Sequence, residues 1–353
     1  MSLPQINTQY LTDFLVRLLN TPSPTGRAEP AIALVEQELA GVEGLSLSRT
    51  RKGALVASWN VESDLPPVAL TAHADTLGAM VKAIKPDGRL QITRIGGLLL
   101  NAVETEGCWV FASNGERVRG SLLTNAASAH VFGSQSTEMK RDEEHMEIRL
   151  DAVTKSAAET EALGIRVGDY VAFDPRVEVT NGFIRSRHLD DKACVATLVA
   201  AIRAMKDAGQ SPSRSAFFHF SNYEEVGHGA AAGIPPEVHE LITVDMAAAG
   251  PGQESDEFHA TICLKDSGGP YHHGLSNKLR AIAEANDIPY KTDIYPYYGS
   301  DGEAFWRAGG DVAVALIGPG IDASHNYERT HIDSLVATTR WIMAYLTGGQ
   351  VVG

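Results

Sequence analysis

The chain has 353 residues, of which 44% are hydrophobic, and its formal net charge is −14. This length exceeds the usual size of one domain and the apolar content can fill a large core, so we expect two domains. The acidic balance, without any run of Lys or Arg, argues against nucleic acid or an anionic membrane surface as a partner.

The cysteines and the apolar segments indicate the compartment. Cys108, Cys194 and Cys263 are far apart and show no disulfide or metal-binding spacing, so we predict small buried side chains in a reducing environment. The first residues lack the basic and apolar regions of a signal peptide. No apolar run is long enough to span a bilayer. The expected location is the cytoplasm.

The first 77 residues predict part of an α/β domain. Apolar residues recur at helical spacing in two segments, and alternating or continuous apolar runs that predict strands follow them. The predicted elements are helices over Thr8–Leu19 and Pro30–Leu39, a hairpin of Leu45–Thr50 and Ala54–Trp59, and a buried strand over Pro67–Ala72.

The pattern changes after Gly78. From there to about Val179 the segments are short, punctuated by glycine and often alternating, which predicts a small β-rich domain of the barrel type. The charged stretch Ser134–Glu147 predicts an exposed loop. The predicted strands are Ala79–Ile84, Leu90–Ile95, Cys108–Ser113, Glu116–Leu122, Met146–Leu150 and Tyr170–Phe173.

The α/β pattern returns at Gly182. The predicted elements are helices over Asp191–Met205, Asn277–Asn286 and Ala337–Leu346, and strands over Ala216–Ser221, Leu241–Asp245 and Ala313–Ile317. We therefore predict an α/β domain formed by residues 1–77 and 181–353, into which a β-rich domain, residues 78–180, is inserted.

Acidic residues and histidines follow the apolar strands at or just beyond their carboxyl ends. In an open α/β sheet this edge is where ligands bind. Five such sites in one order predict a hydrolase that uses two metal ions. The sites are His73 with Asp75, Asp190 with Asp191, Glu224 with Glu225, Asp245, and a histidine near the C-terminus.

The paired residues predict a division of labour. His73 and Asp75 point the same way in an extended segment, so the Asp75 carboxylate can accept the free ring N–H and orient the other ring nitrogen toward a metal. One carboxylate of the pair at 190–191 is expected on metal and the other at a helix start. One glutamate of the pair at 224–225 is expected to hold a metal, while the other accepts the proton of the attacking water.

The remaining ligands are less closely defined by pattern. Asp245 follows an apolar strand and is a candidate terminal ligand. His325 and His331 compete for the last position, and we favour His325. Histidine and carboxylate donors suit Zn²⁺, Co²⁺ and Mn²⁺ alike, so the pattern predicts two divalent ions without choosing the metal.

Five motifs in this order resemble those of the M42 family of metallo-aminopeptidases, and the resemblance spans nearly the whole chain. The motifs are Thr71-Ala72-His73-Ala74-Asp75, Gly164-Ile165-Arg166-Val167-Gly168-Asp169, Leu189-Asp190-Asp191-Lys192, Glu224-Glu225-Val226-Gly227 and Gly299-Ser300-Asp301-Gly302. The resemblance implies the zinc-peptidase fold, a mixed α/β sheet flanked by helices, with an inserted β-barrel-like domain used in assembly. It also implies a homo-oligomer, often a dodecamer with an internal chamber.

The same resemblance implies roles for individual residues. It assigns Glu224 as general base and Asp75 as the orienting carboxylate. The implied metal ligands are His73, Asp190 as the bridging residue, Glu225, Asp245 and His325. The chain departs from the family pattern at His188 and Lys192, beside the aspartate pair, and over Ser324–His331.

The expected reaction is hydrolysis of the amide bond next to a free amino group, which removes the N-terminal residue of a peptide. One alternative is an amidohydrolase or deacylase that acts on a small N-acylated or osmolyte-type dipeptide amide. Another is an inactive descendant that serves as a binding or assembly module. The complete set of predicted ligands favours an enzyme over the last alternative.

Overall fold

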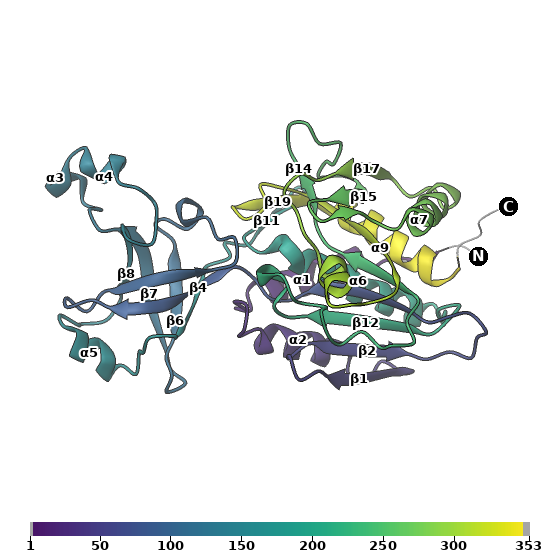
Figure 1. The fold of residues 1–353 in the computed structure, drawn as a ribbon, viewed down its shortest axis with the longest axis horizontal. Helices are drawn as coiled ribbons and strands as arrows, with labels where there is room; N and C mark the ends of the chain where they lie inside the picture. The colour runs from purple at the N-terminus through teal and green to yellow at the C-terminus, as the bar shows by residue number, and fades with distance from the viewer. Residues whose placement is uncertain (1–2, 349–353) are drawn as a thin grey trace.

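The computed structural model describes residues 3–348. Residues 1–2 and 349–353, which fall in the predicted α/β domain, lie outside the described residues. Figure 1 shows a small β-rich body beside a larger α/β body, with extended segments between them. The predicted fold class is confirmed, because a mixed sheet flanked by helices carries an inserted closed barrel.

The large sheet places four parallel strands at its centre. Along its main path the strands are, in order, β1 (Leu45–Arg49), β2 (Leu55–Trp59), β12 (Ala216–Ser221), β3 (Val68–His73), β13 (Glu240–Val244), β18 (Ala313–Asp322), β19 (Glu328–His331), β11 (Phe183–Ser186) and β10 (Glu178–Thr180). The strands that pair off this path are β14 (Ala247–Ala249), β15 (Ala260–Asp266), β16 (Gly269–Pro270) and β17 (Tyr290–Ile294). Because β12, β3, β13 and β18 are parallel, their carboxyl ends meet at one edge.

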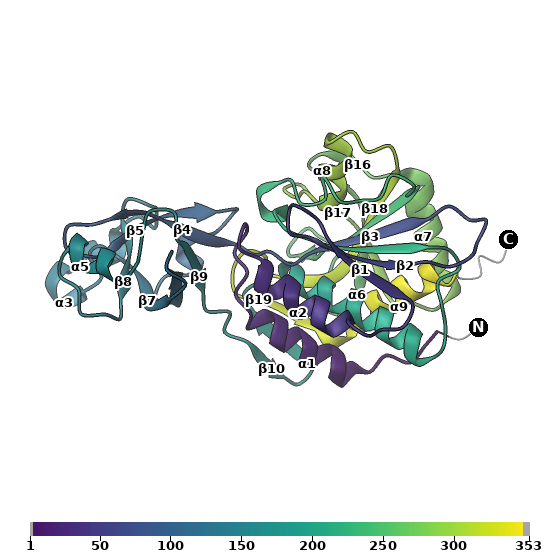
Figure 2. The same cartoon turned by 90° about the horizontal axis from the view of Figure 1, so that it is seen from below.

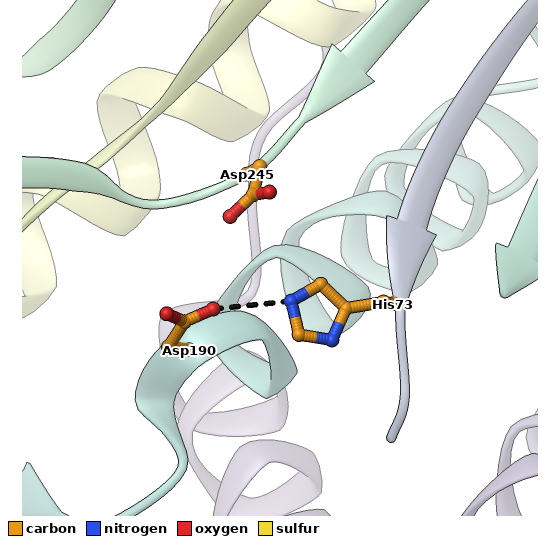
Figure 3. Close-up of side chains that lie close together, drawn as sticks. All are labelled: His73, Asp190 and Asp245. Atoms are coloured by element: carbon orange, nitrogen blue, oxygen red, sulfur yellow. Dashed lines mark hydrogen bonds and ion pairs between the residues drawn. The ribbon is translucent and has the colours of Figure 1, made fainter. Parts of the chain in front are cut away.

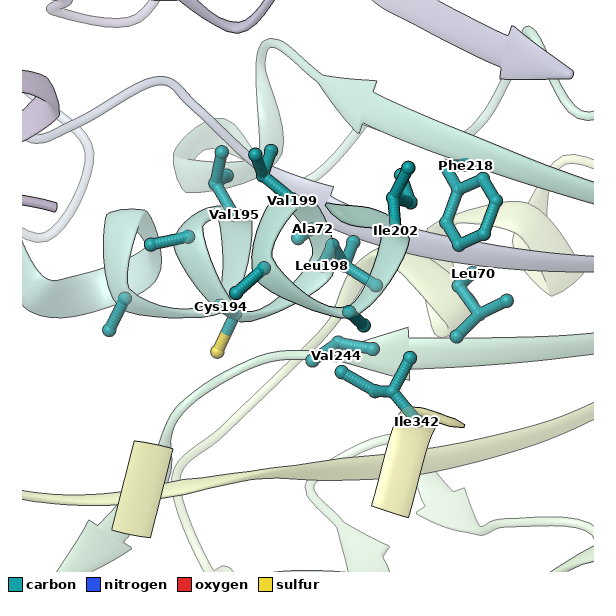
Figure 4. Packing of buried hydrophobic residues seen from close by; sticks show 14 of the residues in the cluster. Leu70, Ala72, Cys194, Val195, Leu198, Val199, Ile202, Phe218, Val244 and Ile342 are labelled. Carbon is teal, nitrogen blue, oxygen red and sulfur yellow. The ribbon is translucent and has the colours of Figure 1, made fainter. Parts of the chain in front are cut away.

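Helices cover both faces of this sheet. The main helical layer, seen below the sheet in Figure 2, includes α1 (Thr8–Leu19), α2 (Glu29–Leu39), α6 (Leu189–Asp207) and α9 (Ile332–Leu346). Helix α7 (His273–Ala285) packs into the same core cluster, whereas the short α8 (Asp301–Arg307) contacts β3, β13 and β18. Alternation along the strands separates the faces: Leu70 and Phe218 pack toward α6 (Figure 4), while Ala69 belongs to the opposite cluster.

The inserted body is a closed six-stranded barrel with its own apolar core. In barrel order its strands are β4 (Gly78–Ile84), β5 (Leu90–Ile95), β8 (Met146–Leu150), β7 (Arg117–Thr124), β6 (Gly107–Phe111) and β9 (Tyr170–Phe173). Short helices decorate its connections: η1 (Leu100–Ala102), α3 (Ala129–Phe132), α4 (Gln135–Glu138) and α5 (Ala157–Ala162).

Several local predictions need correction. The predicted loop Ser134–Glu147 contains the short helix α4, and β15, β17 and α5 have no counterpart among the predicted elements. Strand β18 continues to Asp322 instead of ending at Ile317, because Gly318 and Gly320 let other backbone segments pass against it. A Cβ at Gly318 would lie 1.7 Å from the carbonyl oxygen of Asp245.

Two other expectations can be compared with the described residues. All three cysteines are free and buried, as predicted. Within residues 3–348, no helix combines the length and the apolar character that crossing a bilayer requires.

Candidate metal centre

The carboxyl edge of the parallel strands gathers the predicted site residues. His73 is the last residue of β3, and Asp245 directly follows β13. Glu224 and Glu225 lie in the short turn η2 (Glu224–Val226), which follows β12. The site is completed by Asp190 at the start of α6 and by His325 in the connection from β18 to β19.

Two groups of side chains could each hold a metal ion, and they share Asp190. One group is His73, Asp190 and Asp245; the other is Asp190, Glu225 and His325, and in each the donor atoms lie within 4.8 Å of one another. Oδ1 of Asp190 is 3.1 Å from Nε2 of His73 (Figure 3), while Oδ2 is 3.6 Å from Nε2 of His325. The two oxygens of one carboxylate therefore face two different histidines, one from each candidate donor group.

The electrostatics of the site fit cations. Burial, followed by the neighbouring Asp190, raises the pKa of Asp245 to about 7. Burial also raises the pKa values of Glu224 and Glu225 well above their usual range, and nearby carboxylates add to the effect. Buried carboxylates in such a cluster are unfavourable when ionised unless positive charge offsets them. The nitrogen and oxygen donors suit Zn²⁺, Co²⁺ or Mn²⁺.

The pKa of the histidine between these carboxylates is also raised, although burial alone would lower it. Burial by itself disfavours the protonated form of His73, but Glu224 and the hydrogen bond to Asp190 raise its pKa well above the usual value. The hydrogen bond and charge of His73 in turn lower the pKa of Asp190 despite its burial. Both pKa directions have the same physical cause, because negative charge around His73 favours a positive charge at this place.

Asp75 contacts different groups from those expected. Its backbone carbonyl oxygen, not its carboxylate, forms the hydrogen bond to Nδ1 of His73, at 2.9 Å, while Oδ1 lies 3.7 Å away. The carboxylate accepts hydrogen bonds from the backbone N–H groups of Glu224 and Glu225, at 3.2 and 3.4 Å, and from the Thr25 hydroxyl. The side chain therefore orients the glutamate turn, and the backbone beside it orients the histidine.

The two glutamates differ in their neighbours. Glu225 belongs to the second donor group, and its Oε2 is 3.7 Å from Nε2 of His325. Glu224 is in neither donor group, although its Oε2 lies 3.6 Å from Nε2 of His73. Glu224 is thus beside the candidate metal positions without being one of the grouped donors.

His331 lies away from both donor groups. Its ring contacts Phe183 and Phe258, and its side chain accepts the N–H of Asp333 at the start of α9. His325, by contrast, faces both Asp190 and Glu225. His325 has a positive φ of 62°. Such strained backbone often occurs at functional sites.

Two contributors were not expected from sequence. Glu328 is buried and accepts hydrogen bonds from the backbone N–H groups of Asp190 and His325, each at 3.1 Å. The carbonyl oxygen of Gly97, in the barrel connection after β5, lies 3.3 Å from Nδ1 of His325. The only sequence signal for Glu328 is its place in Ser324–His331; Gly97 gives none. Asp191, the partner of Asp190, is fully buried and accepts the His73 backbone N–H at 3.2 Å.

A cavity of about 750 Å³ lies over the centre. It reaches from Asp190 and Glu224 to Arg307, and Leu99 from the barrel connection also lines it. Tyr298 lines the same cavity and donates its hydroxyl to the Met246 carbonyl oxygen at 2.7 Å. A cavity of this size accommodates a small molecule or the end of a peptide.

The comparisons with known proteins agree with this architecture. The model of the M42 glutamyl aminopeptidase family matches residues 53–340, and the chain belongs to that family. The protein named "Putative aminopeptidase YhfE" from Bacillus subtilis (strain 168) is 45% identical over 340 residues, which cover 96% of this chain and 98% of that protein. A lysyl aminopeptidase from Pyrococcus furiosus is 28% identical over 187 residues, 52% of each chain. The protein is accordingly a peptidase, a hydrolase of the aminopeptidase class.

Solved structures share the fold at low sequence identity. An aminopeptidase from the archaeon Desulfurococcus kamchatkensis superposes with a TM-score of 0.85 at 22% identity, covering 97% of this chain and 96% of that chain. The Pyrococcus horikoshii TET1 peptidase, described as assembling into a tetrahedron or a large octahedral shell, gives a TM-score of 0.82 at 20% identity and covers 95% and 99%. These structures share the mixed sheet and the inserted barrel.

Proposed function

We propose that this protein removes the N-terminal residue of peptides with the help of two divalent metal ions. The observation that carries the proposal is the placement of Asp190, whose two oxygens face His73 and His325. Asp245 would complete one metal position and Glu225 the other. Membership of an aminopeptidase family supports the reaction class.

The residues of the chain would divide the work as follows. When bound, two divalent ions would supply a water of lowered pKa and polarise the substrate carbonyl group. Glu224 would accept the proton of that water and return it to the leaving amine, since it lies beside His73 but outside both donor groups. Asp75 would hold Glu224 through the Glu224 N–H. The cavity that extends to Arg307 would bind the substrate.

We also propose that the chain forms two domains, an α/β domain of residues 1–77 and 181–353 and an inserted domain of residues 78–180. The inserted domain would form contacts between subunits of a homo-oligomer. The TET1 peptidase with the same fold is described as a large shell, and a related structure is described as a dodecamer. The measurement is the molar mass of the purified protein by light scattering. A monomer at micromolar concentration would contradict this part of the proposal.

The first test of function is a panel of aminoacyl substrates with a free amine, each paired with its N-acetylated counterpart. The protein is freed of metal, reloaded with Zn²⁺, Co²⁺ or Mn²⁺, and its metal content is measured. Metal-dependent cleavage confined to free amines supports the aminopeptidase. Cleavage confined to blocked substrates would replace it with a deacylase. If the protein binds two metal ions but cleaves nothing in the panel, its substrate would be a narrow class of amide. If it binds no metal, the protein would be an inactive module.

A further inference from the structure

Asp301 is a buried carboxylate whose contacts reach across the sheet. It is 1% exposed and begins α8, within the motif Gly299–Gly302. It accepts hydrogen bonds from the Thr71 hydroxyl at 3.1 Å, from the Ser221 hydroxyl, and from the Ala230 backbone N–H at 2.7 Å. These three donors all lie outside α8. The side chain therefore does more than begin a helix.

The three donors flank the metal centre in sequence. Thr71 is two residues before His73 on β3, and Ser221 ends β12 three residues before Glu224. β3 and β12 are parallel neighbours, and Ser221 is paired with His73 in their register. Ala230 lies where the chain returns from the glutamate turn. One carboxylate thus connects both strands with the far end of that turn.

Other charged side chains hold the same turn at different points. Asp75 accepts the backbone N–H groups of Glu224 and Glu225. Lys52 donates from Nζ to the carbonyl oxygen of Gly229 at 2.7 Å, and its ammonium group lies near the Tyr223 ring. The turn that carries both glutamates is therefore fixed at its start, middle and end.

Gly229 shows how closely the backbone approaches Asp301. A Cβ at Gly229 would lie 2.0 Å from Oδ1 of Asp301 and 3.0 Å from the Ser221 hydroxyl oxygen. Any side chain at this position would push the turn away from the carboxylate. The approach of Gly229 and the hydrogen bond at Ala230 are two signs of the same close packing.

We propose that Asp301 is a positioning residue, which sets the location of the Glu224–Glu225 turn relative to His73. It acts through hydrogen bonds to the two strands and to the Ala230 backbone, and it belongs to neither candidate donor group. The inference rests on the proposed function for what Glu224 and Glu225 do, but not for where they are held. Displacing the turn would move the proton acceptor and one metal ligand together, and small displacements of reacting groups reduce turnover strongly.

The test compares Asp301→Ala and Asp301→Asn with Asp169→Ala. Asp169 is a matched control: it is 7% exposed, lies in the barrel, and accepts from the Ser113 hydroxyl and from the Arg166 N–H at 2.8 Å. For each variant we would measure the melting temperature, kcat and KM on the best free-amine substrate, and Co²⁺ affinity by the absorption of the bound ion.

We expect Asp301→Ala to lower kcat by roughly 10–100-fold, the usual range for groups that orient metal ligands. The affinity of the more weakly bound of the two Co²⁺ ions should fall by a similar factor. KM should change less than kcat. Asp301→Asn should recover much of both losses, because its amide oxygen can accept the Ala230 N–H and its amino group can donate to a rotated hydroxyl. Asp169→Ala should lower the melting temperature while kcat and Co²⁺ affinity remain those of the wild type.

The inference is overturned if folded Asp301→Ala keeps wild-type kcat and Co²⁺ affinity, or if Asp169→Ala loses them equally. If Asp301→Ala does not fold, Ser221→Ala, which removes one of the three donors, takes its place with the same criteria. Should the wild type cleave no substrate of the panel, the proposed function fails, and the Co²⁺ affinities alone still decide whether Asp301 positions the turn.

Discussion

Strand β13 begins with one carboxylate, Glu240, and is followed directly by another, Asp245, and the two carboxylates have different neighbours. Glu240, at the start of the strand, accepts hydrogen bonds from Arg214 and Tyr345 at 2.7 Å and from Lys278 at 2.9 Å. Asp245, just beyond the end, has the carboxylates of Asp190 and Asp301 as well as the His73 ring among its neighbours. The same strand thus carries one acid that Lys and Arg side chains neutralise, and it leads to another that is a candidate metal ligand.

The pKa directions express this difference. Burial would raise the pKa of Glu240, but the hydrogen bonds from Lys278 and Tyr345 and the charge of Arg214 lower it below its usual value. Burial and Asp190 raise the pKa of Asp245 to about 7. A structural ion-pair network and a candidate metal centre can therefore be distinguished by whether Lys or Arg side chains lie beside the buried acid.

The largest expected effect concerns Glu224, the proposed proton acceptor at the carboxyl edge. Glu224→Gln should lower kcat by roughly 10²–10⁴-fold, because a neutral amide cannot accept the proton of the attacking water. Metal content should stay at the wild-type value, since Glu224 lies outside both donor groups. Steady-state kinetics and elemental analysis on the same sample check both statements. Near-wild-type turnover would assign the base elsewhere.

The second prediction concerns stabilisation by metal. Divalent ion at about 100 times its dissociation constant should stabilise the fold by about 2.7 kcal/mol relative to the chelated protein. Asp190→Asn should abolish most of this gain, because Asp190 belongs to both donor groups. Thermal unfolding with and without Co²⁺ measures the gain. An undiminished gain in Asp190→Asn would mean that the stabilising ion binds at another place.

The amino edge of the sheet should respond to pH instead of metal. Because the pKa of Glu240 is lowered in the folded protein, its stabilising contribution is present above its unfolded pKa of about 4.5 and disappears as pH falls through the folded value. Glu240→Gln should cost roughly 1.5–3 kcal/mol near neutral pH, and the cost should shrink in acid. Urea titrations at pH 7 and pH 3.5 measure it. If Glu240→Gln also lost bound metal, the prediction that Glu240 acts on stability alone would be wrong.

The smallest effect is expected where the barrel meets the centre. A Cβ at Gly97 would lie 2.8 Å from Nδ1 of His325, so Gly97→Ala should turn the imidazole and lower metal affinity by roughly tenfold. Gly250→Ala is the control, since a Cβ there meets nothing within 4 Å. Co²⁺ titration compares the two. Equal affinities would show that the barrel connection does not orient His325.

Much of the fold follows from local patterns. The helix predicted over Thr8–Leu19 has those bounds in the structure, because its apolar residues keep helical spacing and Asn7 caps its start. The change to short alternating segments after Gly78 likewise predicts the barrel. The end of β18 is missed because Gly318 and Gly320 resemble a break, and only the neighbouring backbone explains them.

The sequence by itself determined the fold class, the family motifs and the residue types that are candidate metal donors, because these depend on local periodicity and on strand ends. Only the tertiary structure decided how they combine. It brought His325 to Asp190 and left His331 packed against Phe183 and Phe258. It also placed Glu328, Gly97 and Asp301 beside the site. Their partners Asp190, His325 and Thr71 lie 138, 228 and 230 residues away along the chain, respectively. Contacts over such separations leave no periodic trace, because they arise only when distant elements pack together.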